Sequence, residues 1–327
     1  MLSKISAILE CSRIFSLPMT IMSWVVIFVY SLMESGNVIY GILALVGICF
    51  AHLATNVLDD YFDYKSLIKQ ADFDKTTYLK NAQKTKCRCI LIGRISINEV
   101  LLLAIFYLGI AGLIGLFFFL KCGIGVLYFA IIGGMLAIFY SFLSKIKLSE
   151  LAVALAYGPA LFGGVYYVMT ETYSWKVFLL AIPTMIMTVV LLYIHTVMDY
   201  EYDINENKNT IANSFDSQLD SLRLLKIFLF SAYFSLIFLC IFDVLDWQVF
   251  LVLFTIPLAK DLYESMFDFA TNNSSVPKHK WYHFPMENLQ YLEEVNAKSF
   301  MMRMYQSRNL MIYFSIIFAF AIVLGLN

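Results

Sequence analysis

VIYGILALVGICFAHLATNVLDDYFDYKS, at residues 38–66, is an apolar run that ends in three aspartates. A helix of about 20 apolar residues crosses the roughly 30 Å hydrocarbon core of a bilayer, and the apolar part of this run has that length. Its polar end carries Asn56, Asp59, Asp60 and Asp63. At about 100° per residue, Asn56, Asp60 and Asp63 fall within a sector of about 60°, and Asp59 lies beside it. The run therefore predicts a transmembrane helix with an acidic cluster on one side of its end.

The whole chain has the composition of a membrane protein. Of its 327 residues, 61% are hydrophobic and only 14% are charged, whereas soluble domains have about 45–50% apolar and about 25% charged residues. Apolar runs of spanning length recur and predict an all-α, integral membrane bundle of nine transmembrane helices, forming a single domain over residues 1–327. The spans are expected near residues 14–34, 38–58, 98–119, 123–143, 150–170, 176–198, 222–243, 247–265 and 309–326.

The distribution of lysine and arginine predicts the orientation of these helices. Basic residues accumulate in cytoplasmic connections, and the short connections after spans one, three, five and seven contain only Lys121 and Lys176 of the 23 basic residues. We therefore expect the N-terminus in the cytoplasm and the C-terminus outside. The cytoplasmic connections are long and leave room for functional groups near residues 59–97, 199–221 and 266–308.

Several other kinds of site fit the sequence poorly. Lysine and arginine number 23 against 24 aspartates and glutamates, and no long basic run suggests a nucleic-acid partner. The six cysteines are scattered without the paired spacing of a zinc site, which favours unpaired thiols. His279 and His283 are spaced like a metal pair, but their charged, irregular surroundings favour a surface segment. The lipid bilayer is the expected environment of the chain.

A second acidic cluster follows the sixth apolar run. Its members, spaced four, four and three residues apart, are His195, Asp199, Asp203 and Glu206. This spacing places them on one helical face, and the predicted topology puts both clusters on the cytoplasmic side. A carboxylate costs about 2.5–3.5 kcal/mol at the centre of a membrane helix and less near the interface. Acids gathered in this way therefore require a cationic partner.

Magnesium and a diphosphate would satisfy the two clusters together. Mg²⁺ prefers oxygen ligands and is usually held by one or two carboxylates plus substrate phosphates. The pattern therefore indicates a diphosphate bound between the clusters. Arg88, Lys145 and Lys208 lie on the same predicted side and are either phosphate contacts or positive-inside anchors. Lys208 is the strongest candidate for a phosphate contact because it follows the second cluster directly.

Both clusters resemble motifs of a known family. Asp-Asp-Tyr-Phe-Asp at residues 59–63 is similar to the Asn-Asp-x-x-Asp motif of the UbiA superfamily of intramembrane prenyltransferases, and Asp-Tyr-Glu-Tyr-Asp at residues 199–203 is similar to its Asp-x-x-x-Asp motif. The resemblance covers nearly the whole chain. It implies Mg²⁺-dependent transfer of a prenyl group from a membrane-embedded polyprenyl diphosphate to an aromatic acceptor, by an enzyme of the inner (cytoplasmic) membrane.

Within the family, the chain looks most like the branch that prenylates 1,4-dihydroxy-2-naphthoate in menaquinone biosynthesis. The likeness rests on Asp-Asp-Tyr-Phe-Asp-Tyr-Lys-Ser at residues 59–66 and on the trailing Lys-Asn-Thr that begins at Lys208. Several differences stand against it, including His195 and Thr196 where that branch tends to have asparagine. Asp59 replaces the family's opening asparagine, and Leu67 or Lys69 stands where the family has a further acid.

The resemblance also implies roles for individual residues. The implied metal ligands are Asp59, Asp60, Asp63, Asp199 and Asp203, and the last four of these are the implied catalytic residues. The implied substrate-binding residues are Asn56, Arg88, Lys145, Lys208, Tyr64 and Tyr202. The two tyrosines would shield an allylic cation with their ring faces.

Two alternatives stay open at this point. The acceptor of a UbiA-type enzyme could instead be 4-hydroxybenzoate, a haem or a glycerol-phosphate lipid. Intramembrane acids also mark ion paths, so a cation-coupled transporter is the second alternative. Transporters usually place such groups near the bilayer midplane on broken helices, whereas both clusters here come at the cytoplasmic ends of their spans.

Overall fold

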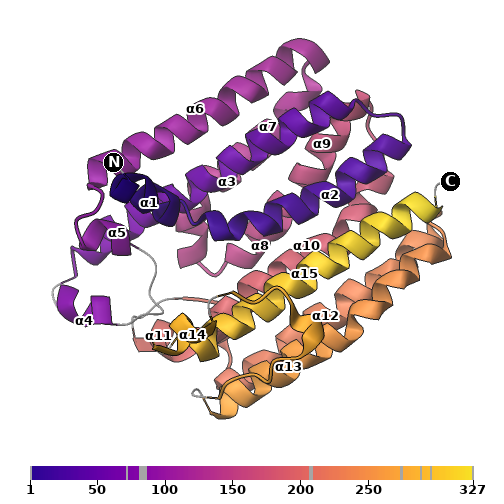
Figure 1. The fold of residues 1–327 in the computed structure, drawn as a ribbon. Coiled ribbons are helices and arrows are strands. Elements are labelled where there is room, and N and C mark those ends of the chain that lie inside the picture. Colours follow the sequence, from indigo (N-terminus) through magenta and orange to yellow (C-terminus); the bar gives the residue numbers. More distant parts are fainter. Residues whose placement is uncertain are drawn as a thin grey trace.

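The computed structural model describes residues 2–70, 73–80, 87–205, 209–272, 275–287, 289–294 and 297–325. These residues form helices and their connections, and no strand occurs among them. The long helices lie side by side in one bundle, with the N-terminus near one end and the C-terminus at the other (Figure 1). The all-α class predicted from the sequence is therefore confirmed.

Eight helices of the described chain are long and apolar enough to cross a membrane, which makes the protein multi-pass. The first, Lys4–Met33, combines α1 (Leu2–Cys11), η1 (Ile14–Ser16) and α2 (Leu17–Met33). The fifth, Ser149–Thr170, combines α8 (Ser149–Leu155), the π-helix η2 (Ala156–Ala160) and α9 (Leu161–Thr170). The other six are α3 (Val38–Leu67), α6 (Ile97–Cys122), α7 (Gly125–Lys145), α10 (Trp175–Met198), α12 (Gln218–Ile241) and α15 (Lys298–Gly325).

The expected span at residues 247–265 does not form one long helix. It consists of the 3₁₀ helix η4 (Trp247–Thr255), followed by α13 (Ile256–Thr271). The second half carries Lys260, Asp261 and Glu264 on successive turns, so it is amphipathic rather than uniformly apolar. The expected count of nine is therefore not confirmed, because the described helices provide eight.

Both acidic clusters lie at the same end of the bundle. The short helices α1, α4 (Lys75–Lys80), α5 (Arg88–Leu91), α11 (Tyr200–Asn205) and α14 (Leu289–Glu294) gather there, near the N-terminus (Figure 1). The polar end of α3 carries the first cluster, and the junction of α10 with α11 carries the second. The shared side that the sequence predicted for the clusters is thus present in the fold.

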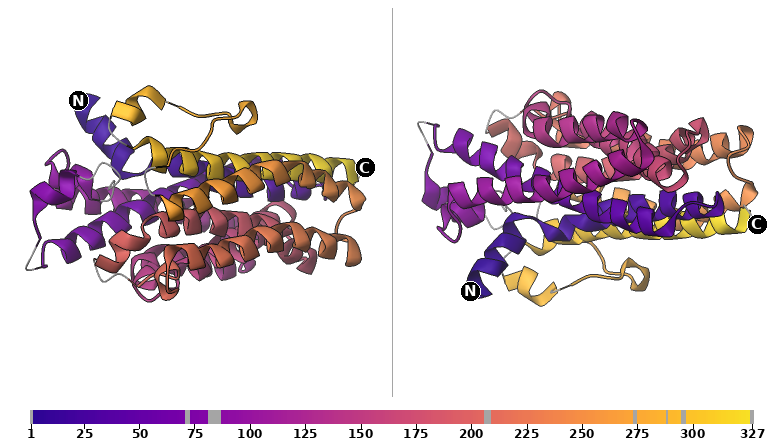
Figure 2. Two further views of the ribbon diagram at one scale, coloured as in Figure 1. Left: turned by 90° about the horizontal axis from the view of Figure 1, so that it is seen from below. Right: turned by 90° about the horizontal axis from the view of Figure 1, so that it is seen from above.

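The chain turns sharply between α1 and α2. Arg13 adopts the left-handed conformation with φ of 50°, which ends α1 and starts the short helix η1. Because of this turn α1 points away from the bundle while α2 runs along it (Figure 2). The turn also places the Arg13 side chain beside the polar end of α3.

A π turn interrupts the fifth span. In η2 each hydrogen bond encloses one more residue than in an α-helix, and Pro159 within it has no N–H to donate. The turn carries Tyr157 toward α3, where its hydroxyl meets His52. Just beyond, a side chain at Gly163 would come within 2.3 Å of Phe129, so α9 can approach α7 this closely only with glycine there.

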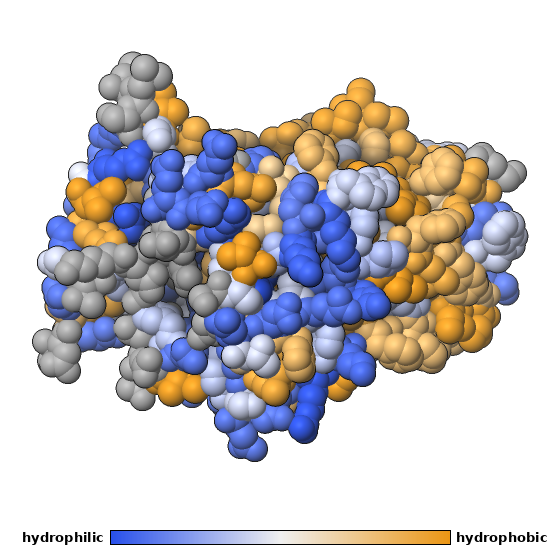
Figure 3. Space-filling view, turned by 60° about the horizontal axis from the view of Figure 1, so that its bottom comes forward, coloured by the Kyte–Doolittle hydropathy of each residue, from blue (hydrophilic) through white to orange (hydrophobic). Residues whose placement is uncertain are grey.

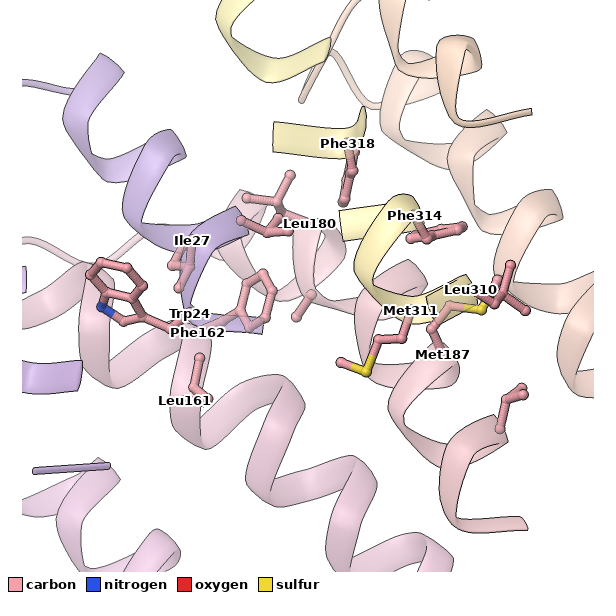
Figure 4. Close-up of a cluster of buried hydrophobic side chains, with 14 of the residues drawn as sticks. Trp24, Ile27, Leu161, Phe162, Leu180, Met187, Leu310, Met311, Phe314 and Phe318 are labelled. Atoms are coloured by element: carbon pink, nitrogen blue, oxygen red, sulfur yellow. The ribbon is translucent and has the colours of Figure 1, made fainter. Parts of the chain in front are cut away.

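The largest apolar core extends over α2, α9, α10, α12, η4, α13 and α15, and part of it lies where α2, α9, α10 and α15 pack together. Its side chains interdigitate between these four helices (Figure 4). Those labelled there include Trp24 and Ile27 of α2, Phe162 of α9, Leu180 and Met187 of α10, and Phe314 and Phe318 of α15. This core holds together helices from both ends of the sequence.

A strap of mostly irregular backbone, residues 275–287 with the short 3₁₀ helix η5 (Trp281–His283), lies along the flank of the bundle (Figure 2). Asp261 of α13 fastens it by accepting hydrogen bonds from Lys280 Nζ (2.7 Å), Tyr282 Oη (2.6 Å) and His283 Nε2 (2.9 Å). Asn309 of α15 donates to the carbonyl oxygen of His283 at 2.6 Å. His283 is only 2% exposed, so the surface position expected for it is wrong.

Arg303 of α15 joins the start of the strap to two helices. Its guanidinium is fully buried and donates to the carbonyl oxygens of Ser265 (2.8 Å), Ser275 (3.0 Å) and Ser299 (2.7 Å). Hydrophilic side chains cover this face near the acidic end and the centre, whereas hydrophobic ones cover the part toward the C-terminus (Figure 3).

Candidate active site

A cavity of about 1200 Å³ runs into the bundle from the acidic end. Along α3 its wall extends from Leu67 down to Ala44, which is about 35 Å of helix at 1.5 Å per residue. Most of the deep wall is apolar, with small residues of α6 and α7 such as Gly115 and Gly134. Ligand pockets usually measure about 300–1,000 Å³, so this cavity has room for a long apolar ligand.

The first acidic cluster lies at the mouth of this cavity. Asn56, Asp59 and Asp63 line the wall. They are three and four residues apart on α3, which places them on one face of the helix. Asp60 is turned to the side, where its carboxylate accepts a hydrogen bond from the backbone N–H of Cys87 at 3.2 Å. Asp59 and Asp60 are each only 2% exposed, and Ser141 Oγ of α7 donates to Asp59 at 3.0 Å. Both acids are therefore held by neighbouring elements.

Arg13 pairs with both of these buried acids. One guanidinium nitrogen forms an ion pair with Asp60, and the other lies 3.4 Å from Asp59 Oδ2. Arg13 also lines the cavity. Its Nε is buried and has no hydrogen-bond partner among the described residues. The sequence reasoning missed Arg13 because an arginine at the start of a span normally indicates a membrane anchor.

The second acidic cluster faces the same cavity from α10 and α11. His195, Asp199, Tyr202 and Asp203 all line it. Although α10 ends at Met198, the backbone N–H of Asp203 still donates to the carbonyl oxygen of Asp199 at 2.8 Å, so the helical phase is kept across the junction. His195 Nδ1 lies 3.1 Å from Asp199 Oδ2. The structure thus brings Asp199 and Asp203 to the cavity that Asp59 and Asp63 line.

The other predicted substrate-binding residues differ in their position relative to the cavity. Lys145, at the end of α7, lines the cavity. Arg88 and Tyr64 do not: Arg88 Nη1 donates to the carbonyl oxygen of Leu79 at 3.2 Å, and Tyr64 packs among the apolar side chains between α3 and the segment around α5. Lys208 and Glu206 lie outside the described residues. Their neighbours Asn209 and Thr210 do line the cavity.

A further polar group in the wall was also missed. His52 lies one helical turn deeper than Asn56 on α3, and both line the cavity. Its ring bonds to Thr20 and Ser16 of the first span and to Tyr157 of η2. A lone histidine in an apolar run gives no signal of such a group, because its three partners come from distant segments.

The oxygen donors in the wall fit Mg²⁺. Four carboxylates, two on α3 and two at the junction of α10 with α11, line the cavity, and carboxylate oxygen is a ligand that Mg²⁺ prefers. Over the described chain, no group of three or more His, Cys, Asp or Glu side chains could hold a metal by itself. Mg²⁺ commonly takes only one or two carboxylates and completes its shell with water and substrate phosphates.

Comparison with known families gives this geometry a context. The sequence profile of the UbiA prenyltransferase family matches residues 16–287. The chain belongs to this family. It is therefore an enzyme that transfers prenyl groups, and the resemblance seen in the two motifs is confirmed for the UbiA family as a whole. No curated protein sequence gives a significant match.

Solved structures share the UbiA fold with the chain. A digeranylgeranylglyceryl phosphate synthase has a TM-score of 0.58 at 14% identity, with 99% of this chain and 98% of that chain covered. A UbiA homologue from Archaeoglobus fulgidus bound to GPP and Mg²⁺ has a TM-score of 0.59 at 12% identity, covering 93% and 99%. A homologue from Aeropyrum pernix K1 without ligand has a TM-score of 0.56 at 16% identity, covering 93% and 97%. At such identities the likeness establishes the fold alone.

Proposed function

We propose that this UbiA-family enzyme transfers a polyprenyl group from a polyprenyl diphosphate to an aromatic acceptor in a Mg²⁺-dependent reaction. One observation carries the proposal: both acidic clusters and Lys145 line the mouth of a single cavity whose deep wall is apolar. The mouth fits a charged diphosphate with its metal, and the deep part fits a hydrocarbon tail. The family membership and the homologue solved with GPP and Mg²⁺ support this arrangement.

The carboxylates divide into two candidate metal sites. Asp59, with Asp63 on the next turn of α3, would hold one Mg²⁺, and Asp199 with Asp203 would hold another. When bound, Mg²⁺ offsets the negative charge that collects on the diphosphate as the allylic C–O bond breaks. Asp60 acts from behind this wall, because it orients Arg13 and is itself fixed by the Cys87 backbone.

The remaining residues of the mouth position the donor substrate. Lys145 presents a flexible ammonium group to the diphosphate, and Arg13 adds positive charge to the same wall. Tyr202 lines the cavity beside the second cluster, where its ring face would stabilise an allylic cation. The helices around the deep wall exclude water, which would otherwise capture that cation.

For the acceptor we propose 1,4-dihydroxy-2-naphthoate, which would place the enzyme in menaquinone biosynthesis. The support comes from the sequence at residues 59–66 and at Lys208, which is similar to the branch with this acceptor. We further propose a location in the inner (cytoplasmic) membrane, with the N-terminus in the cytoplasm. The gathering of acids, basic connections and the N-terminus at one end of the bundle supports this orientation.

A transfer assay tests the proposal. The full chain, purified into nanodiscs, is incubated with labelled geranylgeranyl diphosphate and, separately, 1,4-dihydroxy-2-naphthoate, 4-hydroxybenzoate and a glycerol-phosphate lipid. We expect prenylated naphthoate, none after EDTA, and full recovery on adding Mg²⁺. Asp63→Asn and Asp199→Asn should each lose more than 100-fold in rate while inserting normally. Transfer that is insensitive to EDTA, or full activity in either variant, would refute the metal-dependent mechanism.

The same assay separates the alternatives. Product from another acceptor with none from naphthoate would change the acceptor and leave the enzyme class intact. A cation-coupled transporter would form no prenylated product with any acceptor and would move a cation across sealed vesicles instead.

A further inference from the structure

A hydrogen-bonded group of four side chains lines the cavity below the metal-binding mouth, and we name it the His52 cluster: Ser16, Thr20, His52 and Tyr157. His52 Nδ1 lies 2.5 Å from Thr20 Oγ1 and 2.8 Å from Tyr157 Oη, and His52 Nε2 lies 2.8 Å from Ser16 Oγ. Ser16, His52 and Tyr157 also line the cavity. The cluster lies in the wall seven residues before Asp59 on α3, about 10 Å toward the membrane interior.

The hydrogen-bonding network determines which ring nitrogen of His52 carries the proton. Ser16 Oγ donates to the carbonyl oxygen of Arg13 at 2.8 Å, so its oxygen is left to accept. It accepts from Asn56 Nδ2 at 3.1 Å and from His52 Nε2. This assignment follows from partners rather than from observed hydrogens. His52 therefore carries its proton on Nε2 and offers Nδ1 as an acceptor.

Two hydroxyl groups compete for that acceptor. Thr20 and Tyr157 each bring one proton to His52 Nδ1, which has a single lone pair, and their oxygens lie 3.2 Å apart. One hydroxyl therefore donates to Nδ1 and the other donates to its neighbour's oxygen. In both arrangements these two protons are used inside the cluster, and the Tyr157 oxygen still has capacity to accept.

We propose that the His52 cluster is a subsite that binds a hydroxyl group of the prenyl acceptor, with that O–H donating to Tyr157 Oη. Tyr157 contacts the acceptor, and His52 and Thr20 position the tyrosine. The inference rests on the proposed function and specifies the chemistry of its acceptor: a hydroxyl donor, such as a naphthol or a phenol. A carboxylate or an ether cannot replace it, because neither has a proton to donate.

The backbone supplies a second, independent argument. Tyr157 sits in the π turn η2, and such turns are retained at a cost and occur often at functional sites. The wider turn brings the hydroxyl of Tyr157, on the fifth span, to His52 on the second span. A cluster that only joined helices would not need to face the cavity, yet three of its four members line it.

A binding experiment that requires no transfer tests the subsite. The full chain in nanodiscs is titrated by calorimetry, under anaerobic conditions, with 1,4-dihydroxy-2-naphthoate and with its 1,4-dimethoxy ether. The wild type should bind the dihydroxy probe at least tenfold more tightly, because the ether has no O–H to donate to the Tyr157 oxygen. Tyr157→Phe and His52→Gln should bind both probes alike. Tyr167→Phe, which removes a buried hydroxyl bonded to the Cys122 carbonyl oxygen, is the matched control and should keep the wild-type ratio.

The ratio of the two affinities distinguishes recognition from packing. A purely structural role for the cluster would change the affinities for both probes together, and an unchanged ratio in Tyr157→Phe would overturn the subsite. The subsite is also overturned if the wild type binds the probes equally or binds neither. Discrimination that depends on Tyr157 without any prenyl transfer would support the subsite and count against the proposed function. Prenyl transfer together with an unchanged affinity ratio in Tyr157→Phe would support the proposed function and overturn the subsite.

Discussion

Arg13 forms an ion pair with Asp60 although 47 residues separate them in the chain. The contact joins the turn that precedes α2 to the polar end of α3, and the same guanidinium lies beside Asp59. Both acids are almost fully buried. A buried carboxylate without a partner is costly, so Arg13 compensates the charge of the first cluster when no metal is bound.

Removal of Arg13 should therefore destabilise the protein. Arg13→Ala removes the cation that pairs with two buried carboxylates, and breaking such a pair costs about 3–5 kcal/mol. Thermal denaturation in detergent with EDTA should show a clear fall in the melting temperature. Mg²⁺ should raise the melting temperature of this variant more than that of the wild type, because the metal replaces the lost charge.

A surface pair provides the control for this prediction. Arg223 pairs with Asp220 at 2.8 Å, but its side chain is 79% exposed. Exposed pairs contribute about 0–1 kcal/mol, so Arg223→Ala should melt close to the wild type. Equal melting temperatures for the Arg13→Ala and Arg223→Ala variants would contradict the compensating role of Arg13.

Lys145 and Lys147 should differ in their effect on the donor substrate. Lys145 lines the cavity, whereas Lys147 donates to Ser214 Oγ at 2.9 Å and is not in the cavity wall. Hydrogen bonds to charged groups contribute about 1.5–3 kcal/mol, so Lys145→Met should raise KM for the prenyl diphosphate by about 10- to 100-fold. Lys147→Met should leave it within about twofold. Steady-state kinetics at saturating acceptor measures both, and similar values for the two variants would exclude Lys145 as a diphosphate contact.

Loss of the Asp261 carboxylate should release the strap. Asp261→Ala removes the acceptor of three hydrogen bonds from the strap, so trypsin should cleave after Lys278 and Lys280 at least tenfold faster than in the wild type. The exposed acid Glu264, whose contact with Lys260 spans 3.7 Å, supplies the control Glu264→Ala. Mass spectrometry of timed digests gives both rates. Identical digestion of the two variants would mean that other contacts hold the strap.

The strap should stay fastened well into the alkaline range. The hydrogen bond with Asp261 raises the pKa of Lys280 above the ordinary lysine value of about 10.4. A raised folded-state pKa means that the contribution of Lys280 is fully present below the unfolded-state pKa and is lost only as the pH rises through the folded one. The ratio of the trypsin cleavage rate of the wild type to that of Asp261→Ala should therefore be the same at pH 7 and pH 9. A ratio that shrinks by pH 9 would contradict this assignment.

The thiol of Cys89 should resist alkylation. Burial, with Glu10 nearby, raises the pKa of Cys89 to about 12, and the side chain is 3% exposed. Because the thiolate is the reactive form, iodoacetamide at pH 8 should leave Cys89 unmodified in the native protein and modify it fully in dodecyl sulfate. Peptide mapping by mass spectrometry provides the measurement. Rapid native labelling would show that the segment around α5 opens.

The sequence predicted the features that depend on local spacing. Span length and helical phase are properties of neighbouring residues, so the apolar runs, the polar end of α3 and the orientation of Asp199 and Asp203 could be predicted directly. For the first cluster, the helical spacing alone did not decide which acids face the cavity. Asp59 and Asp60 differ by one position, and contacts with Arg13 and Cys87, rather than the sequence pattern, decide which of them faces the cavity.

Features that depend on distant contacts could not be predicted. Arg13 and the His52 cluster become evident only when separate spans pack together, because neither has a distinctive local pattern. Residues 247–265 are apolar enough to predict a span, but the change from 3₁₀ to α-helix within them depends on packing against α12 and α15. The burial of His283 likewise depends on Asp261, which lies 22 residues earlier.

The π turn has a consequence for how the fifth span tolerates change. The additional residue of this turn sets the rotation of α9 about its axis. The direction of the Tyr157 hydroxyl and the position of Gly163 against Phe129 therefore depend on the same turn. If the same residues formed an ordinary α-helix without the wider turn, α9 would be rotated by about 100°, the rotation of one residue. A residue with a side chain would then face Phe129. The cavity wall at Tyr157 and the contact between α7 and α9 therefore cannot be altered independently.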